Sequence, residues 1–200
     1  YAGVYSLTLT DALSCSATAS TSVTILPKPT LPTAQANPNP VCTEQTLNLL
    51  GSGNGAAGWN WFGPNGFNST LQNPSITNVT LAAAGTYSLY QTLSGCSSDT
   101  AVVVVVVNPK PAQPTITSIS PNPACTGQTV TFSANGQIGA TFNWTGPNGF
   151  SQTGTPVSLT NVALVNAGNY TVTQTVTGCT SNASAPTTLV VNQTPIAPSL

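Results

Sequence analysis

Polar and apolar residues alternate along most of this 200-residue chain. Clear examples are Thr46-Leu47-Asn48-Leu49 and Thr129-Val130-Thr131-Phe132, which lie in stretches rich in Thr, Val and Ile. Alternation with a period of two is typical of β-strands with one buried face, whereas helices repeat every 3.6 residues. No stretch has the helical period. The sequence therefore predicts an all-β fold of antiparallel strands.

Turn residues divide the middle of the chain into about seven short strands, the number and spacing of an antiparallel β-sandwich. The strands are expected near residues 33–37, 44–50, 58–62, 67–71, 75–80, 86–93 and 99–107. Gly, Pro and Asn between them favour tight turns.

One pattern is written twice, 83 positions apart. The first copy contains Cys42, Trp61, Gly63-Pro64-Asn65-Gly66-Phe67, Tyr87 and Cys96; the second contains Cys125, Trp144, Gly146-Pro147-Asn148-Gly149-Phe150, Tyr170 and Cys179. The end of the pattern also occurs near the start of the chain, as Ala2-Gly3-Val4-Tyr5 and Cys15. We therefore expect a tandem array with the end of a truncated repeat at 1–27, full repeats at 28–110 and 111–194, and the start of a further linker at 195–200.

Proline-rich joints lie between the repeats. They read Pro27-Lys28-Pro29 and Pro109-Lys110-Pro111. Because proline fixes φ and favours extended backbone, these joints are expected to be short and stiff. The sequence thus predicts an extended array.

Two aromatic residues lie two positions apart in the third strand of each repeat: Trp59 and Trp61, then Phe142 and Trp144. A period of two places both side chains on one face. The Gly-Pro-Asn-Gly turn that follows leads to Phe67 or Phe150. The cluster is interpreted either as a core aromatic beside a hairpin turn or as a loop that stacks on sugars.

The segment Ala-Gly-x-Tyr precedes the sixth strand, where Ig-type sandwiches have a tyrosine corner. Tyr87 and Tyr170 are the expected corner residues, and Tyr5 is their counterpart in the truncated repeat. Together these features predict tandem Ig-like antiparallel β-sandwiches.

The motifs Asn-Pro-x-Cys-Thr-x-Gln-Thr, Trp-x-Gly-Pro-Asn-Gly-Phe, Ala-Gly-x-Tyr and Gly-Cys resemble the Ig-like or PKD-like repeats of giant secreted proteins of Bacteroidota. Such repeats occur in type IX secretion cargo and gliding-type adhesins. The resemblance covers essentially the whole chain. It implies a long extracellular stalk, fibre or adhesin at the cell surface, without saying which one.

Charge is almost absent from the chain. Only 2% of residues are charged, the net charge is −1, and there is no His. Nucleic-acid binding and adhesion to anionic lipid both need a basic patch, which two lysines do not make. The longest apolar run is too short to span a bilayer. A neutral surface instead suits contact with neighbouring repeats, with copies of the same chain, or with glycans.

Catalytic chemistry has no candidate residues here. An enzyme needs a general acid or base, a nucleophile or a metal. The three carboxylates are Asp11, Glu44 and Asp99, and neither Glu44 nor Asp99 recurs in the second copy. Paired cysteines at zinc spacing and clustered acids for calcium are also missing. We expect no catalytic residue, no metal site and no cofactor.

Five cysteines are candidates for disulfides: Cys15, Cys42, Cys96, Cys125 and Cys179. Pairing within each repeat would join Cys42 to Cys96 and Cys125 to Cys179. Those turns lie at opposite ends of a sandwich, however, and six residues of strand span roughly 20 Å, whereas disulfide Cα atoms lie within about 7 Å. Pairing between consecutive repeats would join Cys42 to Cys179 and leave the others for repeats outside the chain. Free thiols are the third alternative.

A run of one alanine and six valines occupies residues 101–107. A continuous apolar run indicates a strand covered on both faces, or a last strand with some exposed valine. The first interpretation predicts a lateral contact through Val103, Val105 and Val107. Just before this run, Asp99-Thr100-Ala101 resembles the O-glycan acceptor signal of Bacteroidota, so Thr100 is a candidate modification site.

These patterns together predict a non-catalytic structural segment of an extracellular fibre, stalk or adhesin, able to assemble into filaments. The alternative is a ligand-binding adhesin module that stacks glycans near Trp59 and Phe62. Burial of Trp59, Trp61 and Trp144 would favour the structural role.

Overall fold

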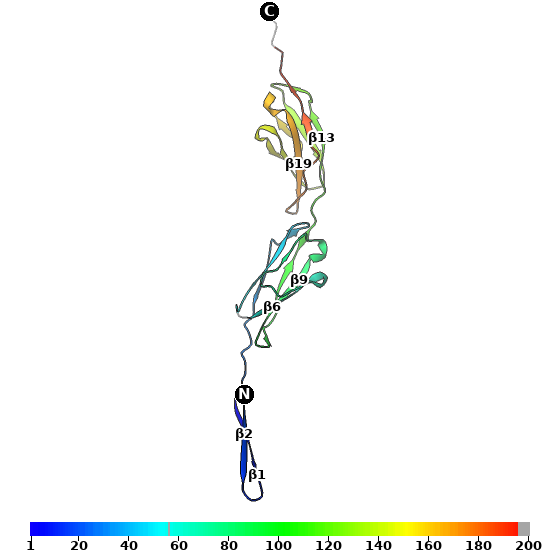
Figure 1. The fold of residues 1–200 in the computed structure, drawn as a ribbon. Helices are drawn as coiled ribbons and strands as arrows, with labels where there is room; N and C mark the ends of the chain where they lie inside the picture. The colour runs from blue at the N-terminus through cyan, green and yellow to red at the C-terminus, as the bar shows by residue number, and fades with distance from the viewer. Residues whose placement is uncertain (56, 196–200) are drawn as a thin grey trace, which may run out of the picture. The chain divides into compact units, whose positions relative to one another are not determined.

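Short strands joined by tight turns make up the computed structural model, which describes residues 1–55 and 57–195. The chain divides into two units, and each is described by itself. The first contains residues 1–39, 47–76 and 82–105, and the second contains residues 40–46, 77–81 and 106–200. Figure 1 labels β6 and β9 in the first unit and β13 and β19 in the second. Residues 196–200, predicted to begin a linker, lie outside the described residues.

The first unit contains a β-sandwich of two antiparallel sheets. One sheet has the order β3 (Thr33–Asn37), β5 (Leu47–Ser52), β8 (Ser75–Ile76). The other has the order β10 (Cys96–Ser97), β9 (Gly85–Leu93), β6 (Gly58–Phe62), β7 (Asn68–Ser69), and β11 (Ala101–Val105) also pairs with β9. This is the strand order of an Ig-like sandwich.

Alternating residues of both sheets fill the space between them. The buried set of the first unit includes Leu47, Leu49, Trp59, Trp61, Tyr87, Leu89 and Val105. In β9 the burial pattern alternates from Tyr87 to Gln91, so every second side chain there reaches the core. The period of two seen in the sequence is thus the period of burial.

The second unit repeats the arrangement. Its sheets are β13 (Thr115–Ser120), β15 (Val130–Asn135), β18 (Val157–Leu159), and β17 (Ser151–Thr153), β16 (Thr141–Thr145), β19 (Gly168–Val176), β20 (Cys179–Thr180), with β21 (Thr187–Leu189) paired to β19. Two short parallel pairs complete the unit: β4 (Val41–Cys42) with β12 (Val107–Asn108), and β14 (Ala124–Cys125) with β22 (Val191–Asn192).

Aromatic rings form the centre of this second core. Phe132 lies 5.6 Å from Trp144, 5.1 Å from Phe150 and 4.6 Å from Tyr170 between ring centroids. Tilted rings at these separations interact favourably beyond simple burial. The all-β Ig-like fold predicted from the sequence is therefore confirmed.

Several strand bounds differ from the sequence prediction. The strands expected at 67–71 and 75–80 are shorter, β7 (Asn68–Ser69) and β8 (Ser75–Ile76), and two further differences have a clear physical reason. The strand expected at 44–50 starts at Leu47, because Glu44 adopts a positive φ of 72° in a turn. The strand expected at 99–107 divides: β11 pairs with β9, and after Val105 the backbone turns to pair with β4. The Val106 carbonyl accepts a hydrogen bond from the Val41 N–H at 3.0 Å.

Residues 3–23 form a hairpin of β1 (Gly3–Thr10) and β2 (Ser16–Val23). Gly3 pairs with Val23 in it, as Gly85 pairs with Val105 between β9 and β11. All of its residues are exposed, including Leu7 and Leu9 at 75% each. The hairpin therefore has the register of the last strands of a repeat.

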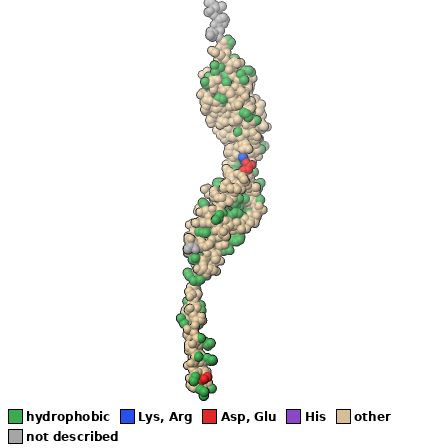
Figure 2. Space-filling model, in the orientation of Figure 1, with side chains coloured by type: hydrophobic (Ala, Val, Ile, Leu, Met, Phe, Trp, Pro, Cys, Tyr) green, Lys and Arg blue, Asp and Glu red, His purple; other side chains and the backbone are tan. Residues whose placement is uncertain are grey.

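The surface carries little charge. Figure 2 shows a face coloured almost entirely as apolar and uncharged polar side chains, with only small areas of blue and red. Two ion pairs are present among the described residues, Lys28–Asp99 and Lys110–Glu44.

Candidate functional site

Cys42 is the last residue of β4 and begins a tight turn. The Cys42 N–H donates to Gln45 Oε1 at 3.2 Å, and the Gln45 N–H donates to the Cys42 carbonyl at the same distance. The Glu44 N–H donates to the Val79 carbonyl at 2.8 Å. These bonds fix the backbone around the sulfur. We call residues 42–45 the cysteine turn.

A two-residue hairpin turn holds Cys179 at the start of β20. Thr177 and Gly178 have φ angles of 48° and 81°, as the central residues of a type I′ turn require. Val176 pairs with Cys179 across it. The sulfur therefore projects from the end of a hairpin, which we call the cysteine hairpin.

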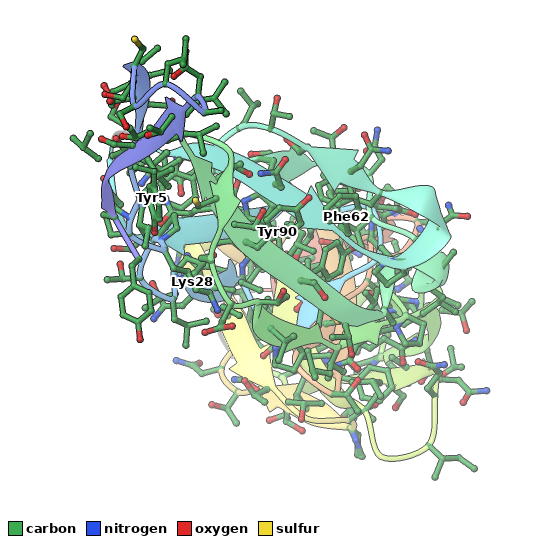
Figure 3. The ribbon with its side chains drawn as sticks, turned by 90° about the horizontal axis from the view of Figure 1, so that it is seen from below. Tyr5, Lys28, Phe62 and Tyr90 are labelled. Atoms are coloured by element: carbon green, nitrogen blue, oxygen red, sulfur yellow. A yellow bond between two sulfur atoms is a disulfide. The ribbon has the colours of Figure 1, made fainter. Side chains whose placement is uncertain are left out.

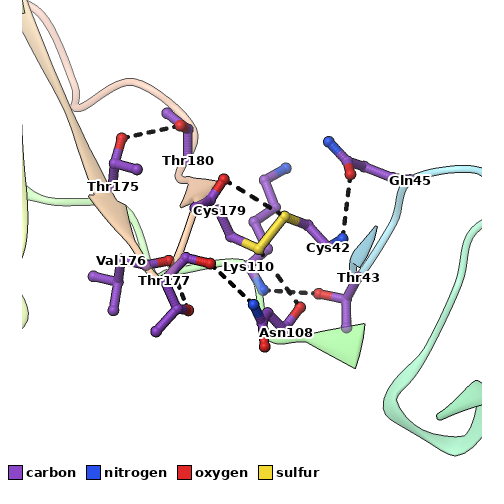
Figure 4. Close-up of a disulfide and its surroundings, with 11 residues drawn as sticks. Cys42, Thr43, Gln45, Asn108, Lys110, Thr175, Val176, Thr177, Cys179 and Thr180 are labelled. Atoms are coloured by element: carbon purple, nitrogen blue, oxygen red, sulfur yellow. Dashed lines mark hydrogen bonds between the residues drawn. A yellow bond between two sulfur atoms is a disulfide. The ribbon is translucent and has the colours of Figure 1, made fainter. Parts of the chain in front are cut away.

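Cys42 and Cys179 form a disulfide (Figure 4), with Cα atoms 5.7 Å apart and a sequence separation of 137. Asn108 lies against it: Nδ2 donates to the Thr177 carbonyl at 2.9 Å, and the Asn108 carbonyl lies 3.8 Å from Cys179 Sγ. Both cysteines lie in the second structural unit, but Cys42 belongs to the first copy of the sequence pattern and Cys179 to the second, so the bond joins the two copies.

The linker after Asn108 is also bound to the cysteine turn. The Lys110 N–H donates to Thr43 Oγ1 at 2.9 Å, and Lys110 Nζ lies 2.7 Å from Glu44 Oε2. The glutamate is 68% exposed, so the ion pair contributes little, about 0–1 kcal/mol. The covalent bond and the backbone contacts are the main constraints here.

Pairing within a repeat is excluded for Cys42, because its sulfur is bonded to Cys179. The second repeat shows the reason. Cys125 lies beside Asn192, at the end of the sandwich near Gly168, whereas Cys179 lies beside Val176 at the other end of β19. A nine-residue strand spans about 27 Å, far beyond the reach of a disulfide. Of the three alternatives left open by the sequence, the structure shows pairing between consecutive repeats for Cys42 and Cys179.

Cys15, Cys96 and Cys125 are free thiols in this chain. Cys15 is exposed, and the other two are partly exposed.

The tryptophans of the predicted sugar-stacking cluster are buried. Trp61 and Trp144 have no exposed area, and Trp59 is 9% exposed. Two of the ring N–H groups donate internally: Trp61 Nε1 to the Gln72 carbonyl at 3.1 Å and Trp144 Nε1 to the Gly154 carbonyl at 2.9 Å. They are core residues and offer no ring face to a ligand.

Phe62 differs from the tryptophans, because it points away from the core and is 47% exposed. It stacks on Tyr90 of the neighbouring strand, with centroids 5.8 Å apart and planes 10° from parallel (Figure 3). The matching positions of the second repeat are Thr145 and Thr173. This aromatic pair is therefore particular to the first repeat.

Tyr87, Tyr170 and Tyr5 make the same hydrogen bond. Each hydroxyl donates to the carbonyl four residues earlier, namely Ala83 at 3.0 Å, Asn166 at 2.8 Å and Tyr1 at 3.1 Å. This is the geometry of a tyrosine corner. Burial raises the pKa of the Tyr87 and Tyr170 hydroxyls, because a phenolate would lose its hydration there.

The lateral contact predicted through Val103, Val105 and Val107 requires correction. Val105 and Val107 face inward and are 2% and 8% exposed, so a partner cannot reach them. Instead the intervening residues Val102, Val104 and Val106 are exposed, at 60%, 60% and 47%. The run alternates like any strand with one solvent-exposed face. A lateral contact would therefore involve Val102, Val104 and Val106.

Thr100 lies in an exposed, irregular segment between β10 and β11. The preceding Asp99 carboxylate accepts a hydrogen bond from Lys28 Nζ. Thr100 is therefore exposed at the surface.

Sequence reasoning missed a pair of buried glutamines, Gln91 and Gln174, which are 0% and 1% exposed. Gln91 receives a hydrogen bond from the Asn54 N–H and donates to the Asn54 carbonyl, both at 2.9 Å. Gln174 receives one from the Gln137 N–H at 2.8 Å and donates to the Ala112 carbonyl at 2.7 Å. Their recurrence 83 positions apart, at core positions of an alternating strand, was the available signal.

Within residues 1–55 and 57–195, no group of three or more His, Cys, Asp or Glu side chains gathers to hold a metal ion. None of the helices described there is long and apolar enough to cross a membrane.

No protein-family model and no curated protein sequence matches the chain. Solved structures with similar folds include murine CEACAM1b (17% identity, 80% of this chain and 100% of that one, TM-score 0.47) and domains A168–A170 of titin (12%, 96% and 75%, 0.47). A third is the N-terminal eight Ig domains of Down Syndrome Cell Adhesion Molecule (18%, 96% and 27%, 0.47). The Ig-like assignment rests on the strand order and the tyrosine corners.

Proposed function

We propose that this chain is a non-catalytic structural segment of an extracellular fibre or cell-surface stalk, built from the repeats 28–110 and 111–194. The observation that carries the proposal is the disulfide between Cys42 and Cys179. Disulfides persist in oxidising compartments, which supports a location outside the cytosol. A bond between consecutive repeats resists extension of the thread, a property that suits a mechanical role.

Three further features support a structural role. The residues that recur in both repeats are turn, core and cysteine positions, which specify folding and joining. The tryptophans first considered for ligand binding are buried. The nearly uncharged surface lacks the electrostatic repulsion that keeps proteins apart, so it favours packing against copies of the same chain. The resemblance to repeats of secreted Bacteroidota proteins agrees with this role.

Force spectroscopy on single molecules held at both ends tests the proposal. In the oxidised chain the disulfide closes a loop with a sequence separation of 137, and the residues inside this loop cannot extend. At 3.3–3.6 Å per residue, reduction should add roughly 45 nm to the fully unfolded length. The Cys42→Ser variant should show the longer length without any reductant. Equal lengths for the oxidised and reduced native chain would contradict the mechanical role of the bond. Antibody labelling of intact cells tests the location separately.

A second candidate function, glycan binding, is favoured by the exposed Phe62–Tyr90 stack. Aromatic faces on a flat sheet suit contact with apolar sugar faces. Replacing both residues by threonine would give this surface the residues of the second repeat, Thr145 and Thr173. Loss of glycan-array binding in that variant, but not in Thr145→Ala, would support the binding module. If the native chain binds no glycan, the binding function is rejected and the structural role remains.

A further inference from the structure

Cys125 lies in a turn that matches the bonded cysteine turn bond for bond. Its N–H donates to Gln128 Oε1 at 2.7 Å, and the Gln128 N–H returns to the Cys125 carbonyl at 3.2 Å. The Gly127 N–H donates to the Val162 carbonyl at 2.8 Å, as Glu44 does to Val79. Cys125 is therefore held as Cys42 is held, but its sulfur has no partner in this chain.

Cys96 lies in a hairpin that matches the bonded cysteine hairpin. Ser94 and Gly95 have φ angles of 50° and 82°, close to the 48° and 81° of their counterparts in the second repeat. Cys96 Sγ lies 4.0 Å from the Leu26 carbonyl, just as Cys179 Sγ lies 3.8 Å from the Asn108 carbonyl. Leu26 and Asn108 each precede a Pro-Lys-Pro joint. The hairpin of the free Cys96 therefore lies beside the joint that precedes its repeat, as the hairpin of Cys179 does.

Burial separates the bonded hairpin from the free one. Cys179 is 1% exposed, whereas its counterpart Cys96 is partly exposed; Cys125 is partly exposed, as its bonded counterpart Cys42 is. Each free thiol therefore retains an accessible side.

We propose that Cys96 and Cys125 are the two open halves of the same cross-link, so that one disulfide recurs at every joint of the repeat array. The bond has a direction, because it joins the cysteine turn of one repeat to the cysteine hairpin of the next. Cys125 therefore takes a hairpin cysteine from a following repeat, and Cys96 takes a turn cysteine from a preceding one. Cys15 lies beside the loop of the β1–β2 hairpin, so it is a hairpin cysteine like Cys96 and Cys179. The proposal rests on the proposed function, since it needs an oxidising compartment.

Formation of each bond is a balanced exchange. One cysteine thiolate attacks the disulfide of an oxidised thiol oxidoreductase and forms a mixed disulfide with it. The thiolate of the neighbouring repeat then attacks the repeat's sulfur in that mixed disulfide. Two thiols lose two protons and two electrons, and the oxidant leaves as its reduced dithiol.

An extended chain tests the Cys125 half. Residues 111–194 are inserted a second time after residue 194, which supplies Cys125 with an inserted copy of Cys179. The protein is oxidised, alkylated and mapped by mass spectrometry without reduction. We expect a peptide that links Cys125 to the inserted hairpin cysteine, beside the Cys42–Cys179 peptide. Substituting the inserted copy of Cys179 by serine should leave Cys125 alkylated.

A second extended chain tests the Cys96 half. Residues 28–82 are joined in front of Tyr1, so that β1 and β2 become the last strands of a complete repeat. We expect the inserted copy of Cys42 to bond to Cys96.

The two chains have an internal control. If Cys42–Cys179 forms while Cys125 and Cys96 remain alkylated, the recurrent cross-link is overturned and the proposed function stands. If Cys42–Cys179 fails to form as well, the proposed function loses its main support. A peptide linking Cys96 to Cys125 would also overturn the directional pairing.

Discussion

Gly63 lies against the ring of Tyr87 so closely that a Cβ atom on the glycine would stand 2.4 Å from Cδ1 of the tyrosine. Gly146 has the same relationship to Tyr170, also at 2.4 Å. Both rings are fully buried and hydrogen-bonded at the corner, so neither can move aside. The glycine that opens each Gly-Pro-Asn-Gly turn is therefore required by close packing.

The substitution Gly63→Ala should consequently destabilise the first sandwich by about 1–3 kcal/mol through overpacking. Urea denaturation measures the loss. Gly58→Ala is the matched control, since the nearest atom to its Cβ would be the Thr92 carbonyl oxygen at an ordinary 3.7 Å. Equal stability of the two variants would show that the ring can yield.

Replacing Gln174 by leucine should destabilise the second sandwich by about 1–3 kcal/mol. The change keeps the size of the side chain but leaves the Gln137 N–H and the Ala112 carbonyl without their partner. Chemical denaturation again gives the free energy of unfolding. Gln193→Leu, at an exposed position, should change it by less than about 0.5 kcal/mol. A neutral Gln174→Leu would mean that water satisfies both groups.

The buried tyrosine hydroxyls predict loss of stability at alkaline pH. Their pKa is raised in the folded chain, so the folded state keeps protons that the unfolded state releases above its pKa of about 10. This contribution is fully present below pH 10 and is lost as pH rises through the folded pKa. The variant with Tyr87→Phe and Tyr170→Phe should show a shallower alkaline decline in denaturation midpoint. It should also lose about 1 kcal/mol per hydroxyl at neutral pH. If the midpoint of the double variant falls at alkaline pH as steeply as that of the native chain, ionisation of these tyrosines is not the cause.

Exposed valines in β11 should promote association. Replacing Val102 and Val104 by threonine removes apolar surface without touching the core, so folding stability should change by less than about 0.5 kcal/mol. Sedimentation velocity should show weaker self-association at high concentration. Val105→Thr, which buries a hydroxyl, should instead reduce stability. Undiminished association of the double variant would exclude this strand as a contact.

Much of the fold could be read from the sequence, because strand alternation reports burial directly. The strands at 33–37 and 58–62 have their predicted bounds. The tyrosine corners follow from a motif with a defined geometry. Which valines of residues 102–107 face the core could not be predicted, since six identical residues give no alternation to mark the inner face.

The disulfide pairing was only partly predictable. Strand length argued against bonds within a repeat, but sequence alone could not place a turn of one repeat beside a hairpin of another. The buried glutamines were missed because single polar residues in an apolar alternation resemble surface positions. Their partners, the backbone groups of Asn54 and Gln137, come from loops 37 residues away.

The Cys42–Cys179 bond has a consequence for durability. Its loop encloses most of both sandwiches, since the two cysteines are separated by 137 in the sequence. A protease that cuts the backbone once inside this loop leaves both pieces attached through sulfur. A thread exposed to digestive enzymes would thus stay continuous after such a nick, and severing it there would need either a reductant or a cut outside the loop.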